Sequence, residues 1–310
     1  MHDTLAKTQP VFCECKVSHF FPFEKIILHF FSVSHDFMGF KPLLSDKKSC
    51  CSNCHEKQFE YFCAIKTTLT MGKTQGIVLR TVKYGDNSMI VDLYTNTRGR
   101  ASFVTRVIRS RRSGVSSALW APMTWIEFEA PESRGGKLPS IKQPLIIHPY
   151  STLNFRPDKA AIVIFLSEFL SHALKEEEPS EPLFRFLTES LQWLDRAKAD
   201  YANFHLMFSV RLTTFLGIQP NLEAFSPDSV FNLADSTYET FPPLHGTYLP
   251  PEEARWLPTL FRLNYRTMRL LKLRRPQKTR FMKIINDYYR IHVPSFPTLQ
   301  SPDILREIFA

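Results

Sequence analysis

The sequence predicts an α+β protein in which a small β-barrel precedes an all-helical domain. Between residues 71 and 150, apolar and polar side chains alternate with period two in five short segments, which are joined by Gly-bearing turns. After Tyr150 the apolar period changes to about 3.6, the period of amphipathic helices. All six cysteines lie before Met71, so the first seventy residues differ in composition from the rest of the chain.

The five predicted strands follow one another closely after Met71. The turn between the first two contains Tyr84-Gly85-Asp86-Asn87, and the next turn contains Arg98-Gly99. The predicted ranges are Thr74 to Lys83, Ser88 to Asn96, Ala101 to Ile108, Met123 to Glu129 and Leu138 to Ile146. Five short strands suggest a closed or nearly closed barrel, for which an OB-fold is the leading candidate and an SH3-like barrel the alternative.

Helical periodicity governs most of residues 151–310, which we expect to form the second domain. The predicted helices are Asp158 to Lys175, Glu181 to Arg196, Tyr201 to Leu216, Pro251 to Leu257, Thr259 to Leu273 and Pro276 to His292. Between them, Ile218 to Pro250 contains five prolines in a polar context and predicts an inserted irregular loop. We expect Phe225, Phe231 and Tyr248 to pack this loop back onto the helices.

Residues 1–70 show no convincing helix or strand period, and three interpretations compete for them. The first is a zinc module built on Cys51 and Cys54, with Cys50, His55 and Cys63 as further ligands. The second is a targeting segment, although charges and prolines interrupt its apolar run. We favour the third, translated upstream sequence that is largely disordered, with Met71 as the working start.

The charge balance predicts an anionic partner. The chain of 310 residues carries a net charge of +9 and has a pI near 9.2, which favours binding to a polyanion. No apolar run reaches the ~18 residues that a membrane span needs. Residues 71–310 contain no cysteine, which suits a reducing compartment, so we expect a cytoplasmic, nucleoid-associated protein.

Six arginines without an acidic neighbour surround the third predicted strand and the loop that follows it. They are Arg98, Arg100, Arg106, Arg109, Arg111 and Arg112 in the stretch RGRASFVTRVIRSRRSG. On an OB-fold this region borders the face that binds single-stranded nucleic acid, so we predict that these arginines contact phosphates. A solvated, protected sheet edge is the alternative. Four aromatic residues are either stacking surfaces or core: Tyr84, Tyr94, Phe103 and Trp120.

A second basic region lies near the C-terminus. Its predicted members are Arg266, Arg269, Lys272, Arg274, Arg275, Lys278 and Arg280, with Arg262 and Lys283 beside them. The segment has almost no acidic residues, which predicts contact with DNA or with an acidic partner tail. A solvated helix face is the alternative.

The sequence disfavours an enzyme. There is no phosphate-binding GxxxxGK[ST] loop, and the histidines and carboxylates lack metal-ligand spacing, so we assign no catalytic residue, no metal and no cofactor. A metal-dependent nuclease is therefore a weak alternative. An RNA-binding module is a second alternative, because OB-folds also bind RNA.

Three stretches resemble the bacterial recombination mediator family RecO. The opening MGKTQGIVLRTVKYGDNSMIVDLYTNTRGRASFVTRVIRSRR, residues 71–112, resembles the family's first strands and their Tyr-Gly-Asp turn. The tail NDYYRIHVPSFPTLQSPDILREIF is similar to the family's Tyr-Tyr-x-x-His ending, and FLGIQPNLE matches the entry into its inserted loop. The resemblance covers residues 71–310 and leaves residues 1–70 outside it.

The resemblance implies an OB-fold joined to a helical domain that binds single- and double-stranded DNA. It also implies annealing of complementary strands and assistance in loading RecA onto strands coated by single-stranded DNA-binding protein. The implied partners are RecR and the acidic, hydrophobic C-terminal tail of the coating protein. Many relatives carry four zinc-binding cysteines in the inserted loop, whereas Ile218 to Pro250 has none, so we predict no structural zinc there.

Overall fold

The computed structural model describes residues 73–106, 118–131, 137–175 and 178–309, and all structural statements below concern these ranges. The chain divides into two units, Met1–Ala64 and Ile65–Ala310, and every described residue belongs to the second. The cysteine-rich N-terminal region and its three interpretations therefore lie outside the described residues.

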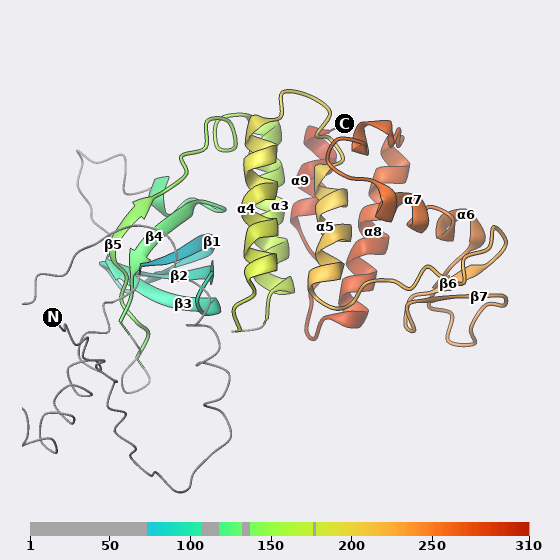
Figure 1. Cartoon of the computed structure of the whole chain (residues 1–310), viewed down its shortest axis with the longest axis horizontal. Coiled ribbons are helices and arrows are strands. Elements are labelled where there is room, and N and C mark those ends of the chain that lie inside the picture. The colour runs from blue at the N-terminus through green and yellow to red at the C-terminus, as the bar shows by residue number, and fades with distance from the viewer. Residues whose placement is uncertain (1–72, 107–117, 132–136, 176–177, 310) are drawn as a thin grey trace, which may run out of the picture. The chain divides into compact units, whose positions relative to one another are not determined.

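Five antiparallel strands form the N-terminal sheet (Figure 1). They are β1 (Thr74–Tyr84), β2 (Ser88–Thr95), β3 (Gly99–Arg106), β4 (Trp125–Glu129) and β5 (Lys142–Ile146), in the order β3-β2-β1-β4-β5. The two ends of this order meet at Val104: its N–H donates to Pro139 O, and its carbonyl accepts from Ile141 N, both at 3.0 Å. A parallel bridge between Val104 and Ser140 accompanies these bonds and closes the sheet into an OB-fold barrel.

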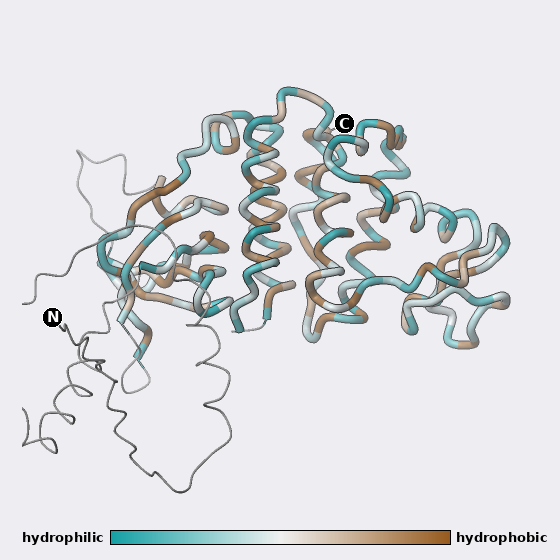
Figure 2. The backbone as a smooth tube through the Cα atoms, viewed as in Figure 1, coloured by the Kyte–Doolittle hydropathy of each residue, from teal (hydrophilic) through white to brown (hydrophobic). Residues whose placement is uncertain are grey.

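The inner face of the barrel carries the alternate apolar residues that the sequence predicted. Val91 and Leu93 of β2 are fully buried beside Phe103 of β3, whose ring meets Phe128 edge-on at 5.0 Å. Gly76 is required where β1 crosses this core, because a Cβ there would lie 3.2 Å from the Phe128 ring. Figure 2 shows the alternation of hydrophobic and hydrophilic residues along these strands.

The helices follow the predicted pattern with small changes at their ends. They are α3 (Pro157–Ala173), α4 (Glu181–Arg196), α5 (Phe204–Phe215), α6 (Pro251–Ala254), α7 (Leu257–Arg262), α8 (Arg275–His292) and α9 (Ser301–Ile308), with a short 3₁₀ turn η1 (Met268–Leu270). Helix α9 was not predicted as a separate helix. No helix among the described residues has the length and apolar character that crossing a membrane would require.

Helix α3 connects the barrel to the C-terminal end of the chain through two consecutive residues. The Ser167 hydroxyl donates to the Leu79 carbonyl of β1. The Glu168 carboxylate accepts from the backbone N–H groups of Gln300 and Ser301, at 2.9 and 2.8 Å. Glu168 therefore satisfies the free N–H groups at the start of α9 and neutralises the positive end of its dipole.

One predicted helix is wrong over half of its length. The sequence predicted helix from Thr259 to Leu273, but α7 ends at Arg262 and an irregular segment follows. The cause is Asn264, whose side-chain oxygen accepts from the backbone N–H groups of Arg266 and Thr267. Asparagine competes with the helical backbone in this way, so local side-chain bonding ends the helix.

The inserted segment is more regular than the predicted loop. It contains a three-stranded sheet of β6 (Val230–Asn232), β7 (Thr237–Glu239) and β8 (Tyr248–Leu249), in the order β7-β6-β8. The buried Asn232 amide donates to the carboxylates of Asp235 and Glu239, at 2.8 and 2.6 Å. Phe231 is fully buried as expected, whereas Phe225 remains 39% exposed against the edge of Tyr238.

The Tyr-Tyr-x-x-His motif attaches α8 to its neighbours. Tyr289 donates to Ser209 O in α5, and Tyr288 donates to Ile218 O at the start of the insert. His292 Nε2 lies 2.7 Å from Leu233 O, next to β6. These three side chains hydrogen-bond to backbone carbonyls of α5 and of the inserted segment. The motif therefore has a structural role.

Candidate nucleic-acid interface and basic groove

The outer face of β1, β2 and β3 divides into a covered half and an exposed half. In the covered half, Ile77, Leu79 and Tyr94 belong to the main core with the helices, and the Tyr94 ring stacks on Phe184. The register of β1 shifts between Val78 and Arg80, and beyond this bulge the β1 side chains on the same face, Arg80, Val82 and Tyr84, are exposed. The bulge thus marks the boundary of the exposed half.

Three rows of side chains cross the exposed half. Arg80, Asp92 and Ser102 form the first row by strand register, and Val82, Ile90 and Val104 form the second. Tyr84, Ser88 and Arg106 form the third. We name the exposed, mostly apolar part the barrel strip, and it consists of Val82, Tyr84, Ile90, Val104 and Arg106.

The side chains of the barrel strip suit contact with unpaired bases. Tyr84 is 60% exposed and Val82 is 47% exposed, while Ile90 and Val104 are half-buried between them. Arg106 is exposed at the end of β3 and has no ion pair with another described residue. An exposed ring beside apolar side chains and a free guanidinium can stack on bases and contact phosphates.

In the first row, a buried carboxylate compensates the positive charge of a neighbouring arginine. Asp92 is buried and accepts from Arg80 Nε and from Ser102 Oγ, each at 2.6 Å. Burial alone would raise the pKa of the Asp92 carboxyl, but these hydrogen bonds and the nearby arginines hold it below its ordinary value. The charge of Arg80 is therefore largely compensated.

The predicted barrel arginines occupy different environments. Arg100 Nη1 donates to the Leu174 carbonyl at the C-terminus of α3, at 2.7 Å, and its other nitrogen lies 3.7 Å from Asp92. Arg98 donates to Ala130 O at 3.3 Å, whereas Arg106 faces solvent. Three further predicted members lie outside the described residues: Arg109, Arg111 and Arg112.

Of the four aromatic residues considered for stacking, Tyr84 alone is exposed. Phe103 and Trp120 belong to the barrel core, and Tyr94 belongs to the core with the helices. Sequence reasoning did not select Val82, Ile90 and Val104. Their signal was present in the alternation, because they are apolar residues at positions opposite to the inward-facing set.

The C-terminal basic region is more exposed than the barrel arginines. Residues 255–290 contain eleven Lys and Arg residues and one acid, Asp287. Arg280 forms a two-bond ion pair with Glu253, at 2.6 and 2.7 Å. The other predicted members have no carboxylate partner among the described residues: Arg266, Arg269, Lys272, Arg274, Arg275 and Lys278.

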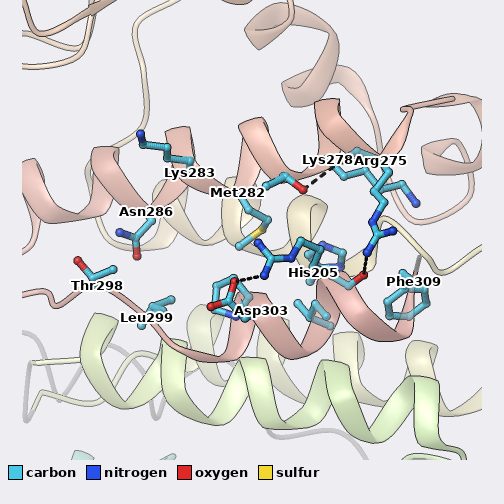
Figure 3. A pocket seen from close by; sticks show the side chains of 14 residues that line it. His205, Arg275, Lys278, Met282, Lys283, Asn286, Thr298, Leu299, Asp303 and Phe309 are labelled. Carbon is cyan, nitrogen blue, oxygen red and sulfur yellow. Dashed lines mark hydrogen bonds and ion pairs between the residues drawn. The ribbon is translucent and has the colours of Figure 1, made fainter.

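A groove of about 210 Å³ lies between α8 and α9, on the edge of this basic region (Figure 3). Lys278 and Lys283 project from α8 at its rim. Met282, Leu299 and Phe309 give it apolar walls. Asp303 faces the groove but is paired with Arg306 at 3.1 Å, so the rim keeps a positive charge.

His205 of α5 forms part of the floor of this groove. It is 3% exposed, and its Nδ1 has no hydrogen-bond partner among the described residues. Burial, with a smaller contribution from the positive charge of Lys278, lowers the pKa of His205 to about 3. Burial also lowers the pKa of Lys278. The imidazole is therefore neutral at pH 7, and the positive charge of the groove comes from its rim.

The described residues contain no group of three or more His, Cys, Asp or Glu side chains able to hold a metal ion. In the inserted segment, the Asn232 amide with Asp235 and Glu239 organises the turn between β6 and β7 by hydrogen bonds. The prediction that no structural zinc is bound there is left to metal analysis.

Comparison with known proteins places both the barrel region and the helical region in one family. Residues 70–150 match the family described as Recombination protein O N terminal, and residues 155–301 match Recombination protein O C terminal. The DNA repair protein RecO of Phocaeicola vulgatus is 44% identical over 238 residues, 77% of this chain and 99% of the relative. RecO of Bacteroides fragilis, strain ATCC 25285, is 44% identical over 238 residues, 76% and 98% of the two chains. RecO of Christiangramia forsetii is 31% identical over 237 residues, again 76% and 98%.

Proposed function

Since the chain belongs to the RecO family of DNA repair proteins, we propose that it binds single- and double-stranded DNA without sequence preference and anneals complementary strands. In this proposal it acts on strands coated by single-stranded DNA-binding protein and assists RecA loading together with RecR. The observation that carries the proposal is the barrel strip, where Tyr84, Val82 and Arg106 combine an exposed ring, an apolar surface and a free cation.

Annealing of this kind needs no catalytic residue. Two polyanionic strands approach each other when cations neutralise their phosphates, and the bases must stay available for pairing. Arginine contacts to phosphate position a strand and carry no base identity, which makes binding tolerant of sequence. Arg106, with the predicted contacts of Arg109, Arg111 and Arg112, supplies these charges. Tyr84 and Val82 hold bases of one strand in the open.

Salt titration separates the predicted arginine contacts after β3 from the apolar part of the barrel strip. Replacing Arg109, Arg111 and Arg112 by Ala should lower the slope of log affinity against log salt by up to roughly three units. Tyr84→Ala should weaken single-strand binding about tenfold and leave the slope unchanged, because stacking does not release counterions. Arg185→Ala with Arg196→Ala and Lys198→Ala removes three exposed charges from α4 and the segment after it, and is the matched control. An equal loss of slope in this control would show that binding follows net charge and not this surface.

The groove between α8 and α9 supports the second partner of the proposal. A C-terminal tail that is acidic and ends in a hydrophobic residue would place that residue against Met282 and Phe309. Its carboxylates would face Lys278 and Lys283. The remaining exposed cations, among them Arg266, Arg269 and Lys272, extend the same charge toward DNA or the acidic part of the tail.

A peptide copy of the coating protein's tail tests this groove by fluorescence anisotropy. Lys278→Glu with Lys283→Glu should reduce peptide affinity at least about tenfold, since two attractive charges become repulsive. Arg185→Glu with Lys198→Glu, two exposed residues of α4 and the segment after it, is the charge-matched control. If both proteins bind the peptide as the parent does, the tail site lies elsewhere.

The two alternatives have separate tests. Competition between DNA and RNA of one sequence distinguishes an RNA-binding module, which would prefer RNA. Incubation of labelled DNA with Mg²⁺ or Mn²⁺ distinguishes a nuclease by cleavage. Annealing of coated complementary strands without nucleotide or metal is the outcome that the proposal requires.

A further inference from the structure

Charge is divided sharply along the helical half of the chain. Residues 212–254 contain six carboxylates and no Lys or Arg, although the whole chain has a net charge of +9. They include the three-stranded sheet of β6, β7 and β8, and we name them the acidic insert. A polyanion is repelled by such a surface, so the acidic insert is unsuited to DNA and suited to a cationic protein surface.

Half of these carboxylates are free to meet a partner. Glu253 is paired with Arg280, while Asp235 and Glu239 accept from the Asn232 amide. Three others are exposed and have no ion pair within the described part of the chain: Glu223, Asp228 and Glu252.

The loop between β7 and β8 presents two large apolar side chains to solvent. Leu244 is 107% exposed and Phe241 is 78% exposed, the former being the most exposed large hydrophobic side chain among the described residues. The backbone between them is restrained by Pro242 and Pro243, which fix φ. Gly246 N–H donates to Pro243 O and adopts φ +69°, a conformation that suits glycine.

We propose that this loop, residues 241–244, docks into the groove between α8 and α9 of a second copy of the chain. The two surfaces are complementary in the same two respects. The loop offers Phe241 and Leu244 within an acidic segment of the chain, and the groove offers apolar walls within a basic rim. The volume of the groove, about 210 Å³, can receive one of these two apolar side chains.

The contact joins two different surfaces, so it does not close on itself. After one contact forms, the pair as a whole keeps one free groove and one free loop, on different copies, so further copies can add to both ends. The proposed partner tail has the same chemistry as the loop and would compete for the groove. The inference rests on the proposed function only in sharing that groove, and self-association can fail while peptide binding succeeds.

Light scattering on the full chain, with reductant present, tests the proposal over a range of protein concentration. The average mass should rise with concentration and pass that of a dimer, and salt should lower it because the contact is partly ionic. The loop variant, Phe241→Ser with Leu244→Ser, removes the two apolar side chains of the loop. The groove variant, Lys278→Glu with Lys283→Glu, reverses the charge at the rim of the groove. Each protein alone should stay monomeric, with association at least about tenfold weaker than the parent's.

Mixing the two variants gives the decisive result. The loop variant keeps its groove and the groove variant keeps its loop, so an equal mixture should form heterodimers and nothing larger. Circular dichroism spectra and denaturation midpoints like those of the parent would show that both variants fold. Any of three results would overturn the proposal. The average mass of the parent could be independent of concentration, either variant could associate as the parent does, or the mixture could form no dimer. Capture of the loop by a different, basic protein would then identify another partner.

Discussion

The arginines of the barrel and the cations of residues 255–290 use their charge in opposite ways. On the barrel, Arg80 and Arg100 both lie near the buried Asp92, and Arg100 also donates to the Leu174 carbonyl at the end of α3. In residues 255–290, most cations are exposed and lack a carboxylate partner among the described residues. The number of arginines in a segment therefore gives only its total positive charge. Ion pairs with buried carboxylates determine how many of those arginines remain available to bind a ligand.

The largest effect should come from breaking the barrel side of this comparison. Asp92→Ala leaves Arg80 and Arg100 without their shared carboxylate and Ser102 without its acceptor. We expect a loss of about 2–4 kcal/mol in the free energy of unfolding, measured by chemical denaturation. Arg269→Ala, which removes an exposed cation, should change the same quantity by less than about 0.5 kcal/mol. Equal losses in the two proteins would contradict the division.

A smaller effect should come from the groove floor, where a titratable group is kept uncharged. The folded pKa of His205 is about 3, below its ordinary value of about 6.5, so protons bind preferentially to the unfolded chain as pH falls. The stability present at neutral pH is thus progressively lost below about pH 6.5. Between pH 6.5 and pH 5 the parent should lose roughly 2 kcal/mol more than His205→Gln, which cannot titrate. Parallel losses in the two proteins would mean that His205 is protonated when folded.

The smallest effect should come from the ion pair where the two charge classes meet. Glu253 of the acidic insert binds Arg280 of α8, and it raises the pKa of that guanidinium. Because both side chains are partly exposed, Glu253→Gln should cost less than about 1 kcal/mol of unfolding free energy. The difference should shrink further in 0.5 M salt, which thermal denaturation at two ionic strengths can check. A large loss that ignores salt would indicate packing in place of charge.

Sequence reasoning was most successful where one physical signal dominated. The period of two located the five strands, and Val91, Leu93 and Phe103 face inward as that period requires. The helices α4 and α8 begin within one residue of their predicted starts, each with proline in the first turn. Fold class and element order therefore follow from local patterns.

Sequence reasoning failed where long-range partners decide. Nothing near Arg100 indicates that its guanidinium binds Leu174 O, which is 74 residues away. The helix predicted through Leu273 missed the competition from Asn264, and the groove depends on α9, which is positioned by Glu168. Three of the predicted DNA-contacting arginines lie outside the described residues, so their role remains a prediction.

The attachment of α9 to Glu168 has a consequence for the order in which the chain matures during synthesis. The hydrogen-bond donors to Glu168 are the N–H groups of Gln300 and Ser301, which are 132 and 133 residues further along the chain. At about 5–20 residues per second, a ribosome needs roughly 7–27 s to supply them. Barrel strands can pair before that time, whereas the groove is completed only after α9 has emerged. A nascent chain would thus be able to form the barrel strip before it can form the groove.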